Sequence, residues 1–163
     1  MLEGKTILGV IPARGGSRRM PFKNITLFRG KALIQWAIEH AEGSKYIDRI
    51  VVSTEDQAIA LHAGKYFLER PAFLAEDRVP TEAVLVHVLH QVTDYDFAVL
   101  LQPTSPLRSV EDIDRSIETA VTNDGVNNLT GCVSYNEYGK RNGAVFVCNV
   151  RHFLQHLSFD AAH

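Results

Sequence analysis

Apolar residues recur along this chain in two alternating patterns. Short continuous apolar runs are typical of strands buried on both faces, and segments with an apolar residue every three or four positions are typical of amphipathic helices. The continuous runs predict strands at 6–11, 49–54, 97–102, 129–135 and 144–149. The spaced patterns predict helices at 31–42, 55–65, 81–92 and 109 to about 121, with a last helix near 153–157.

Strands that alternate with helices of this length form βαβ units and a mostly parallel sheet. A length of 163 residues favours a single domain, 1–163. We therefore expect an α/β fold, a Rossmann-like three-layer α/β/α arrangement. Ligands of such sheets bind beyond the carboxyl ends of the strands. The loops 12–24, 53–56 and 102–108 and the turn before Gly143 should consequently share one rim.

The loop after the first predicted strand combines glycine with cations. Gly15 and Gly16 let the backbone approach an anion, and N–H groups freed by the turn can point at it. Counter-charge comes from Arg14, Arg18, Arg19 and Lys23. The loop lacks the Lys-Ser/Thr pair of a Walker A motif, and Pro21 opposes the helix of a dinucleotide fingerprint. It predicts a site for a nucleotide or phosphorylated substrate, with a solvated basic turn as the alternative.

The loop 102–108, Gln-Pro-Thr-Ser-Pro-Leu-Arg, is the second informative segment. Its two prolines fix the loop shape and so preorganise an amide, two hydroxyls and a guanidinium. Such a loop suits a polyhydroxylated, carboxylated ligand, with Arg108 able to hold the carboxylate. A stiff connection whose Ser and Thr only cap the next helix explains the loop equally well.

Helix-start signals and a further cation frame the remaining loops. Thr81 is predicted to be the N-cap of its helix, and Ser109 with Asp112 has capping-box spacing. Before the Thr81 helix, Arg70 could reach a nucleotide and Asp77 could brace the loop. A surface ion pair is the alternative for both residues.

Composition excludes several classes of partner. The net charge of −2 gives no overall attraction to nucleic acid or to an anionic membrane. No apolar run approaches the ~20 residues that span a bilayer, and we expect no secretory signal. Cys132 and Cys148 lie in apolar runs, as expected for buried reduced thiols. We therefore expect a cytoplasmic protein.

Metal-type patterns are weak. The pairs His87 with His90 and His152 with His156 could each share a helix face, but neither has a third ligand in a recognisable zinc pattern. The Asp-Tyr-Asp sequence at 94–96 precedes a strand. It is therefore predicted to be a turn on the rim opposite the glycine-rich loop.

Five blocks of this chain, in order, resemble the CMP-sialic acid synthetases, also called acylneuraminate cytidylyltransferases. The blocks are 11–24 (Ile-Pro-Ala-Arg-Gly-Gly-Ser-Arg-Arg, then Pro21 and Lys-Asn), 52–56 (Val-Ser-Thr-Glu-Asp), 70–77, 100–108 and 141–146 (Arg-Asn-Gly-Ala-Val-Phe). The first and fourth are specific to this family and its close relatives. The resemblance implies a nucleotide-diphospho-sugar transferase type of fold and transfer of CMP from CTP to a nonulosonic sugar acid, a nine-carbon 2-keto acid, with release of pyrophosphate.

The resemblance also implies roles for individual residues. Catalytic residues that hold the triphosphate would be Arg14 and Lys23. Nucleotide-binding residues would be Ala13, Gly15, Gly16, Ser17, Asn24, Arg70 and Thr81. Sugar-binding residues would be Gln102, Thr104, Ser105, Arg141 and Asn142, with Lys140 beside them.

Three departures from the family leave alternatives open. The family's Asp-x-Asp, which binds the cofactor Mg²⁺, has no counterpart after Val145, so the metal ligands are unknown. The long excursion used for homodimer contacts is reduced to 135–139, and the connection 66–69 is short. The chain is either a compact variant or truncated. It is a cytidylyltransferase, a nucleotide-binding module with reduced or no activity, or a nucleotidyltransferase for another sugar acid such as 3-deoxy-octulosonate.

Overall fold

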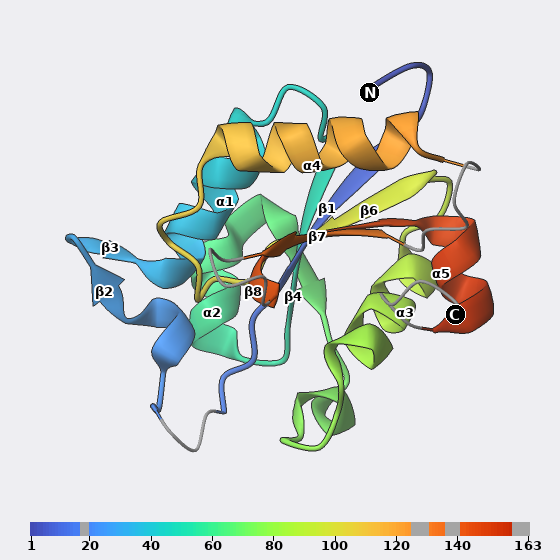
Figure 1. Cartoon of the computed structure of the whole chain (residues 1–163). Helices are drawn as coiled ribbons and strands as arrows, with labels where there is room; N and C mark the ends of the chain where they lie inside the picture. Colours follow the sequence, from blue (N-terminus) through green and yellow to red (C-terminus); the bar gives the residue numbers. More distant parts are fainter. Residues whose placement is uncertain (17–19, 125–130, 136–140, 158–163) are drawn as a thin grey trace.

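The computed structural model describes residues 1–16, 20–124, 131–135 and 141–157, and only the backbone of 131–135 and 141–143. Within these residues one sheet has the strand order β5-β4-β1-β6-β8-β7 (Figure 1). Its strands are β1 (Ile7–Pro12), β4 (Arg49–Thr54), β5 (Phe67–Glu69), β6 (Phe97–Leu100), β7 (Gly131–Tyr135) and β8 (Arg141–Asn149). β1 pairs in parallel with β4 and β6, and β4 with β5, whereas β8 is antiparallel to β6 and β7. The mostly parallel sheet is confirmed.

Helices cover both faces of this sheet. One face carries α1 (Leu33–Gly43), α2 (Gln57–Ala63) and α4 (Val110–Thr122), and the other carries α3 (Thr81–Gln91) and α5 (Val150–His156) (Figure 1). β1 contributes to both cores, because Ile7 and Ile11 pack with the first group and Leu8 and Val10 with the second. A strand buried on both faces reads as a continuous apolar run. The three-layer α/β/α arrangement is thus confirmed.

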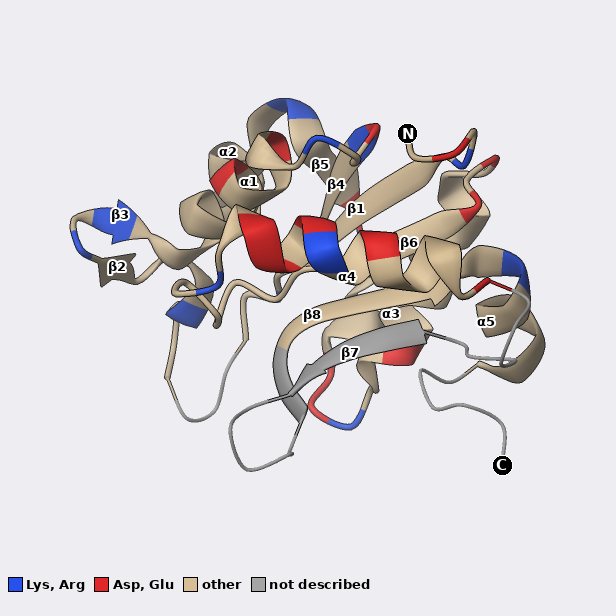
Figure 2. Cartoon of the chain, turned by 45° about the horizontal axis from the view of Figure 1, so that its top comes forward, with Lys and Arg blue, Asp and Glu red and all other residues tan. Residues whose placement is uncertain are grey.

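The helix α4 shows how local sequence determines an element. The Ser109 hydroxyl accepts a hydrogen bond from the Asp112 N–H at 3.1 Å, and the Asp112 carboxylate accepts one from the Ser109 N–H at 3.1 Å. The predicted capping box is therefore formed. Ile113, Ile117 and Val121 recur every four residues and are buried. Figure 2 shows the charged residues of α4 on its outward side.

A small hairpin precedes α1 where the sequence pattern predicted only helix. β2 (Leu27–Phe28) and β3 (Lys31–Ala32) pair antiparallel, so the predicted helix 31–42 begins at Leu33. The Trp36 indole N–H donates to the Phe28 carbonyl at 2.9 Å and ties the hairpin to the helix. The strands are too short to show a pattern of their own, and tertiary pairing overrides the helical periodicity.

The connection after α2 also differs from the prediction. The predicted helix 55–65 narrows to Gln57–Ala63, because Gly64 adopts a positive φ of 53° that ends the α-helix. A 3-10 turn, η2 (Gly64–Tyr66), follows, and the next residues form β5 at the sheet edge. The short connection expected at 66–69 is in fact mostly an edge strand.

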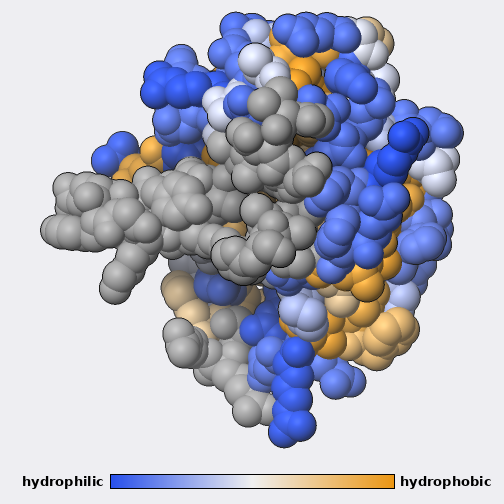
Figure 3. Space-filling view, turned by 45° about the vertical axis from the view of Figure 1, so that its right-hand side comes forward, coloured by the Kyte–Doolittle hydropathy of each residue, from blue (hydrophilic) through white to orange (hydrophobic). Residues whose placement is uncertain are grey.

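Large exposed apolar side chains come from separate elements. Leu27 belongs to β2, Leu61 to α2 and Leu107 to the loop before α4. Figure 3, which brings the side of the molecule near α5 forward, shows mostly hydrophilic residues among the coloured ones, with smaller hydrophobic areas between them. No helix in the described part of the chain is both long enough and apolar enough to cross a membrane.

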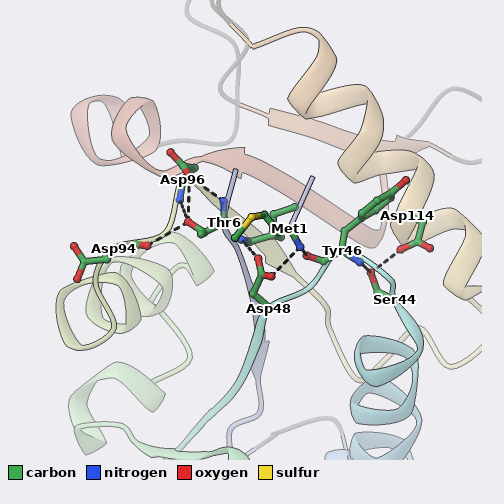
Figure 4. Close-up of polar contacts among 9 residues, drawn as sticks. Met1, Thr6, Ser44, Tyr46, Asp48, Asp94, Asp96 and Asp114 are labelled. Atoms are coloured by element: carbon green, nitrogen blue, oxygen red, sulfur yellow. Dashed lines mark hydrogen bonds and ion pairs between the residues drawn. The ribbon is translucent and has the colours of Figure 1, made fainter. Parts of the chain in front are cut away.

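Carboxylates close the amino-terminal rim of the sheet. Asp48 accepts a hydrogen bond from the Ile7 N–H at 2.8 Å, and Asp96 accepts one from the Thr6 N–H at 2.9 Å (Figure 4). The Thr6 hydroxyl is also within hydrogen-bond distance of the Asp96 carboxylate, at 3.1 Å. The 94–96 segment is thus a structural turn on the rim opposite the glycine-rich loop, as predicted.

Replacing Asp96 with Asn should lower stability in a pH-dependent way. The hydrogen bonds from Thr6 hold the pKa of Asp96 below its ordinary value of 3.8. A depressed carboxyl pKa stabilises the folded state above the ordinary value, and this stabilisation is lost as the pH falls through the folded value. Because the side chain is partly exposed, we expect Asp96→Asn to cost about 1 kcal/mol at pH 7.

Urea unfolding at neutral and acidic pH measures this effect. The stability difference between wild type and Asp96→Asn should shrink as the pH falls below the ordinary carboxyl pKa. Asp94→Asn is the control, because its carboxylate contacts the neighbouring Thr93 hydroxyl and no strand N–H. A difference that stays constant with pH would contradict this role for Asp96.

Candidate functional site

The loops that follow the parallel strands converge on one hollow of about 220 Å³. It lies at the carboxyl-terminal rim of the sheet, where the topology predicts ligand binding. Predicted site residues that line it are Arg14, Lys23, Asn24, Arg70, Thr81, Gln102 and Thr104. These residues come from five separate stretches of sequence, so the fold brings together both predicted catalytic residues, part of the predicted nucleotide set and part of the predicted sugar set.

Arg14 lines the hollow and is bonded to the segment before α3. Its Nη1 donates to the Asp77 carboxylate at 2.8 Å and to the Ala75 carbonyl at 3.3 Å. The Arg14 side chain remains 34% exposed, so the guanidinium is braced and still accessible. The predicted bracing role of Asp77 is confirmed, because it ties the loop after β1 to the segment before α3.

Lys23 and Asn24 are neighbours in the 3-10 turn η1 (Lys23–Ile25) with different surroundings. Asn24 is 4% exposed, and its Nδ2 donates to the Arg14 carbonyl at 2.9 Å. Lys23 lines the hollow and makes no hydrogen bond or ion pair within the described part of the chain. Its ammonium is therefore available to an anion.

Two hydrogen bonds fix the glycine-rich loop to the end of β4 and to the residue that follows it. The Gly15 N–H donates to Glu55 Oε1 at 2.7 Å, and the Ala13 N–H donates to the Ser53 carbonyl at 3.0 Å. The structure thus gives the Gly15 amide a protein partner where an anion was expected. A Cβ added at Gly15 would lie 2.3 Å from Asp56 Oδ2. Gly15 is required by this close approach, whereas Gly16 is exposed. Ser17, like Arg18 and Arg19, lies outside the described residues.

Arg70 is a buried member of the site. It is 4% exposed, and its Nη2 and Nε donate to Glu55 Oε2 at 2.7 and 3.2 Å. Its N–H donates to the Thr54 carbonyl at 3.0 Å, which fixes the backbone beside β4. The ion pair is buried rather than on the surface, and Arg70 nonetheless lines the hollow.

Thr81 does not act as predicted at the start of α3. The helix begins at Thr81 itself, and the N-cap is Pro80, with no side-chain capping bond. Pro80 has the extended conformation of a cap residue, so the helix starts one position earlier than the capping rule suggested. Thr81 is therefore not the capping residue, and it lines the hollow.

The loop 102–108 separates this hollow from a second one. Gln102 and Thr104 line the first, whereas Thr104 and Ser105 line a neighbouring hollow of about 520 Å³. The Ser105 N–H donates to the Gln102 carbonyl at 3.3 Å, and the Arg108 N–H donates to the Ser105 carbonyl at 3.3 Å, so the loop is a series of tight turns. Thr104 lies between the two spaces.

Arg108 braces this loop. It is 6% exposed, and its Nη1 donates to the Ala144 carbonyl of β8 at 2.6 Å. Burial lowers the pKa of its guanidinium to about 10. Its Nε and Nη2 are buried and have no hydrogen-bond partner among the described residues. Arg108 also lines the hollow of about 520 Å³, beside Thr104 and Ser105.

The predicted sugar residues Arg141 and Asn142 begin β8, and their side chains lie outside the description. β8 runs antiparallel to β6 with Leu100 opposite Phe146. Residues before Phe146 therefore continue past the carboxyl end of β6, on the same rim as the hollow. Lys140 is outside the described residues.

A family model described as cytidylyltransferase matches residues 8–149. The chain belongs to the cytidylyltransferase family. It is 30% identical over 186 residues to an N-acylneuraminate cytidylyltransferase of Escherichia coli O18:K1:H7, covering 94% of this chain and 44% of that protein. It is 40% identical over 120 residues to a CMP-N,N'-diacetyllegionaminic acid synthase of Legionella pneumophila, covering 69% and 52%.

This cytidylyltransferase chain spans about half the length of the curated relatives it matches. Its fold is similar to that of a CMP:2-keto-3-deoxy-manno-octonic acid synthetase complexed with CTP. The TM-score is 0.75 at 19% identity, covering 93% of this chain and 77% of that one. This likeness supports the Rossmann-like fold predicted from the sequence.

The cytidylyltransferase site does not supply a complete magnesium site from the described residues. They contain no group of three or more His, Cys, Asp or Glu arranged to hold a metal. Asp77 lines the hollow but binds Arg14. Cys148 is a free thiol with 0% exposure, which confirms the predicted buried thiol, and burial raises its pKa to about 12. Cys132 has no described side chain.

The sequence alone did not reveal the contacts of Glu55. Glu55 lay inside a recognised block, yet no pattern in the chain pairs it with Arg70 or with the Gly15 amide. The available signal was the position of Glu55. It directly follows one predicted strand, and a cation-rich loop follows another. The contacts themselves depend on the strand order.

Substituting Gly15 tests the close approach that holds the loop. We expect Gly15→Ala to lower the free energy of unfolding by about 1–3 kcal/mol, because the added Cβ overlaps the Asp56 side chain. Gly16→Ala is the matched control, since a Cβ there meets no described atom within 4 Å. Urea unfolding measures both variants, and equal stability of the two would contradict the predicted overlap.

Proposed function

We propose that this chain binds CTP in the hollow beyond β1 and β6 and transfers CMP to a nonulosonic sugar acid, releasing pyrophosphate. The observation that carries the proposal is the gathering of Arg14, Lys23 and Arg70 around a single hollow, with Gln102 and Thr104 also lining it. Cations suit a triphosphate, whereas amide and hydroxyl groups suit a sugar. The named activities of the relatives agree with this division.

The proposed reaction is an in-line displacement at phosphorus. The anomeric hydroxyl of the sugar acid attacks the α-phosphorus of CTP, the bond to the β-phosphate oxygen breaks, and pyrophosphate leaves with that electron pair. The hydroxyl proton is released. Little covalent chemistry is required of the protein, so catalysis rests on alignment and on cations that stabilise the developing charge.

The three cations are not equivalent in this role. Arg70 is buried against Glu55, and Arg14 is braced by Asp77, so part of each charge is already compensated. Lys23 lines the same hollow with no such partner in the described structure. We therefore assign Lys23 the largest individual contribution to triphosphate binding.

A nucleotide-binding module without full activity is the second candidate. The observation that favours it is that the described residues form no magnesium site of their own. Mg²⁺ is commonly held by one or two carboxylates together with substrate phosphates. CTP affinity and turnover therefore have to be measured separately.

The proposed function predicts pyrophosphate release from CTP and N-acetylneuraminate, because both substrates would meet at one rim. The assay compares reactions with and without magnesium, and with 3-deoxy-octulosonate as the alternative acceptor. Calorimetry measures CTP binding in parallel. Binding without turnover would favour the nucleotide-binding module, turnover with the alternative acceptor alone would change the sugar, and absence of binding would contradict the proposal.

Removing the Lys23 ammonium should weaken CTP binding with little effect on folding. We expect Lys23→Ala to lose about 1.5–3 kcal/mol of binding free energy, the range for a charge-assisted hydrogen bond. Lys65→Ala is the control, because it removes the same charge from η2, outside the hollow. Calorimetric titration with CTP measures both variants. Equal affinity in the two would remove Lys23 from the site.

A further inference from the structure

Glu55 joins three segments that meet behind the proposed nucleotide site. It follows β4 directly, and β4 lies between β1 and β5 in the sheet. One carboxylate oxygen accepts from the Gly15 N–H after β1, and the other accepts from the Arg70 guanidinium after β5. We propose that Glu55 is a positioning residue for the triphosphate site. This inference rests on the proposed function.

The first step is the orientation of Arg70. The Arg70 side chain is 3% exposed and that of Glu55 is 18% exposed. A buried guanidinium without a counter-charge is strongly unfavourable, so Glu55 compensates the charge of Arg70 and fixes its orientation. Glu55 accepts hydrogen bonds from Nη2 and Nε of Arg70, whereas Nη1 of Arg70 has no hydrogen-bond partner among the described residues. The guanidinium thus keeps one donor group for a ligand.

The second step is the side from which Glu55 approaches. Arg70 lines the first hollow, and Glu55 does not. Glu55 instead lines a different hollow together with Asp56 and Glu69. The carboxylate therefore orients the guanidinium from behind without placing its own negative charge on the wall of the triphosphate hollow.

The third step is the backbone at Arg14. The carbonyl of Arg14 and the N–H of Gly15 belong to one planar peptide group. Asn24 Nδ2 donates to that carbonyl at 2.9 Å, and Glu55 Oε1 accepts from that N–H at 2.7 Å. The peptide plane is therefore held on both sides. Its orientation sets the point from which the Arg14 side chain leaves the loop.

Replacement of Glu55 should consequently weaken CTP binding although Glu55 itself does not line the hollow. Glu55→Gln keeps the shape but places an NH₂ group against the donors of Arg70 or Gly15. We expect the Kd for CTP to rise about tenfold. In the kinetic assay the KM for CTP should rise while the KM for the sugar acid stays unchanged. Glu55→Asp, which retains the charge, should restore part of the affinity.

A double-mutant cycle shows whether Glu55 acts through Arg70. In an Arg70→Ala background, Glu55→Gln should change the Kd by less than about threefold, because the guanidinium is gone and only the contact of Glu55 with the Gly15 N–H remains. Glu69→Gln is the matched control, since it removes a nearby carboxylate from β5 that makes neither contact. Urea unfolding confirms which variants are folded. Glu55→Asp replaces Glu55→Gln in the cycle if the latter does not fold.

A spectroscopic measurement reads the backbone contact independently of activity. The Gly15 amide proton should shift upfield in Glu55→Gln and stay unchanged in Glu69→Gln, because a hydrogen bond to a carboxylate deshields the donor proton. Wild-type protein that fails to bind CTP would overturn the proposed function and this inference together. Wild-type binding with a Glu55→Gln affinity equal to that of Glu69→Gln would overturn the positioning role alone, as would full additivity with Arg70→Ala or an unmoved Gly15 resonance.

Discussion

The proposed nucleotide site depends on the fixed orientation of the peptide group between Arg14 and Gly15. Asn24 holds its carbonyl and Glu55 holds its N–H. Gly15 can lie this close to the segment after β4 only because it has no Cβ. A flexible loop with the same cations would lose conformational entropy on binding, whereas a held loop has already lost it on folding. The glycine-rich sequence thus serves close packing of the protein against itself as well as access for an anion.

The charged residues at the two rims of the sheet have different roles. At the amino-terminal rim, Asp48 and Asp96 accept hydrogen bonds from the N–H groups that begin the first strand. At the carboxyl-terminal rim, Arg14, Lys23 and Arg70 gather around one hollow. Parallel pairing of β1 with β4 and β6 brings these cations to one rim, because it places all of the strands' carboxyl ends on one side. Carboxylates on the opposite rim stabilise the strands without lying beside the cations of the site.

The main elements could be predicted from the sequence because their signals are local. The run at 49–54 matches β4, and the capping box at Ser109 starts α4 as expected. The strand β5 could not be predicted, because three residues at a sheet edge show no periodicity. Site membership was partly predictable, since loops after parallel strands must converge. The Glu55 contacts were not, because they join residues 15 and 40 positions apart that only the strand order brings together.

The cations of this rim differ in their burial and in their partners, and these differences determine what each can contribute. Arg108 is buried with a carbonyl as its partner, so it braces the loop 102–108 against β8. Arg70 is buried with a carboxylate, which compensates its charge and orients it, while Nη1 has no partner among the described residues. Lys23 lines the hollow and has neither kind of partner within the described part of the chain. A triphosphate gains most binding energy from a charge that no protein group neutralises, and it gains specificity from a charged group that cannot move. Lys23, which has no partner among the described residues, and Arg70, which Glu55 orients, provide these two properties in one hollow.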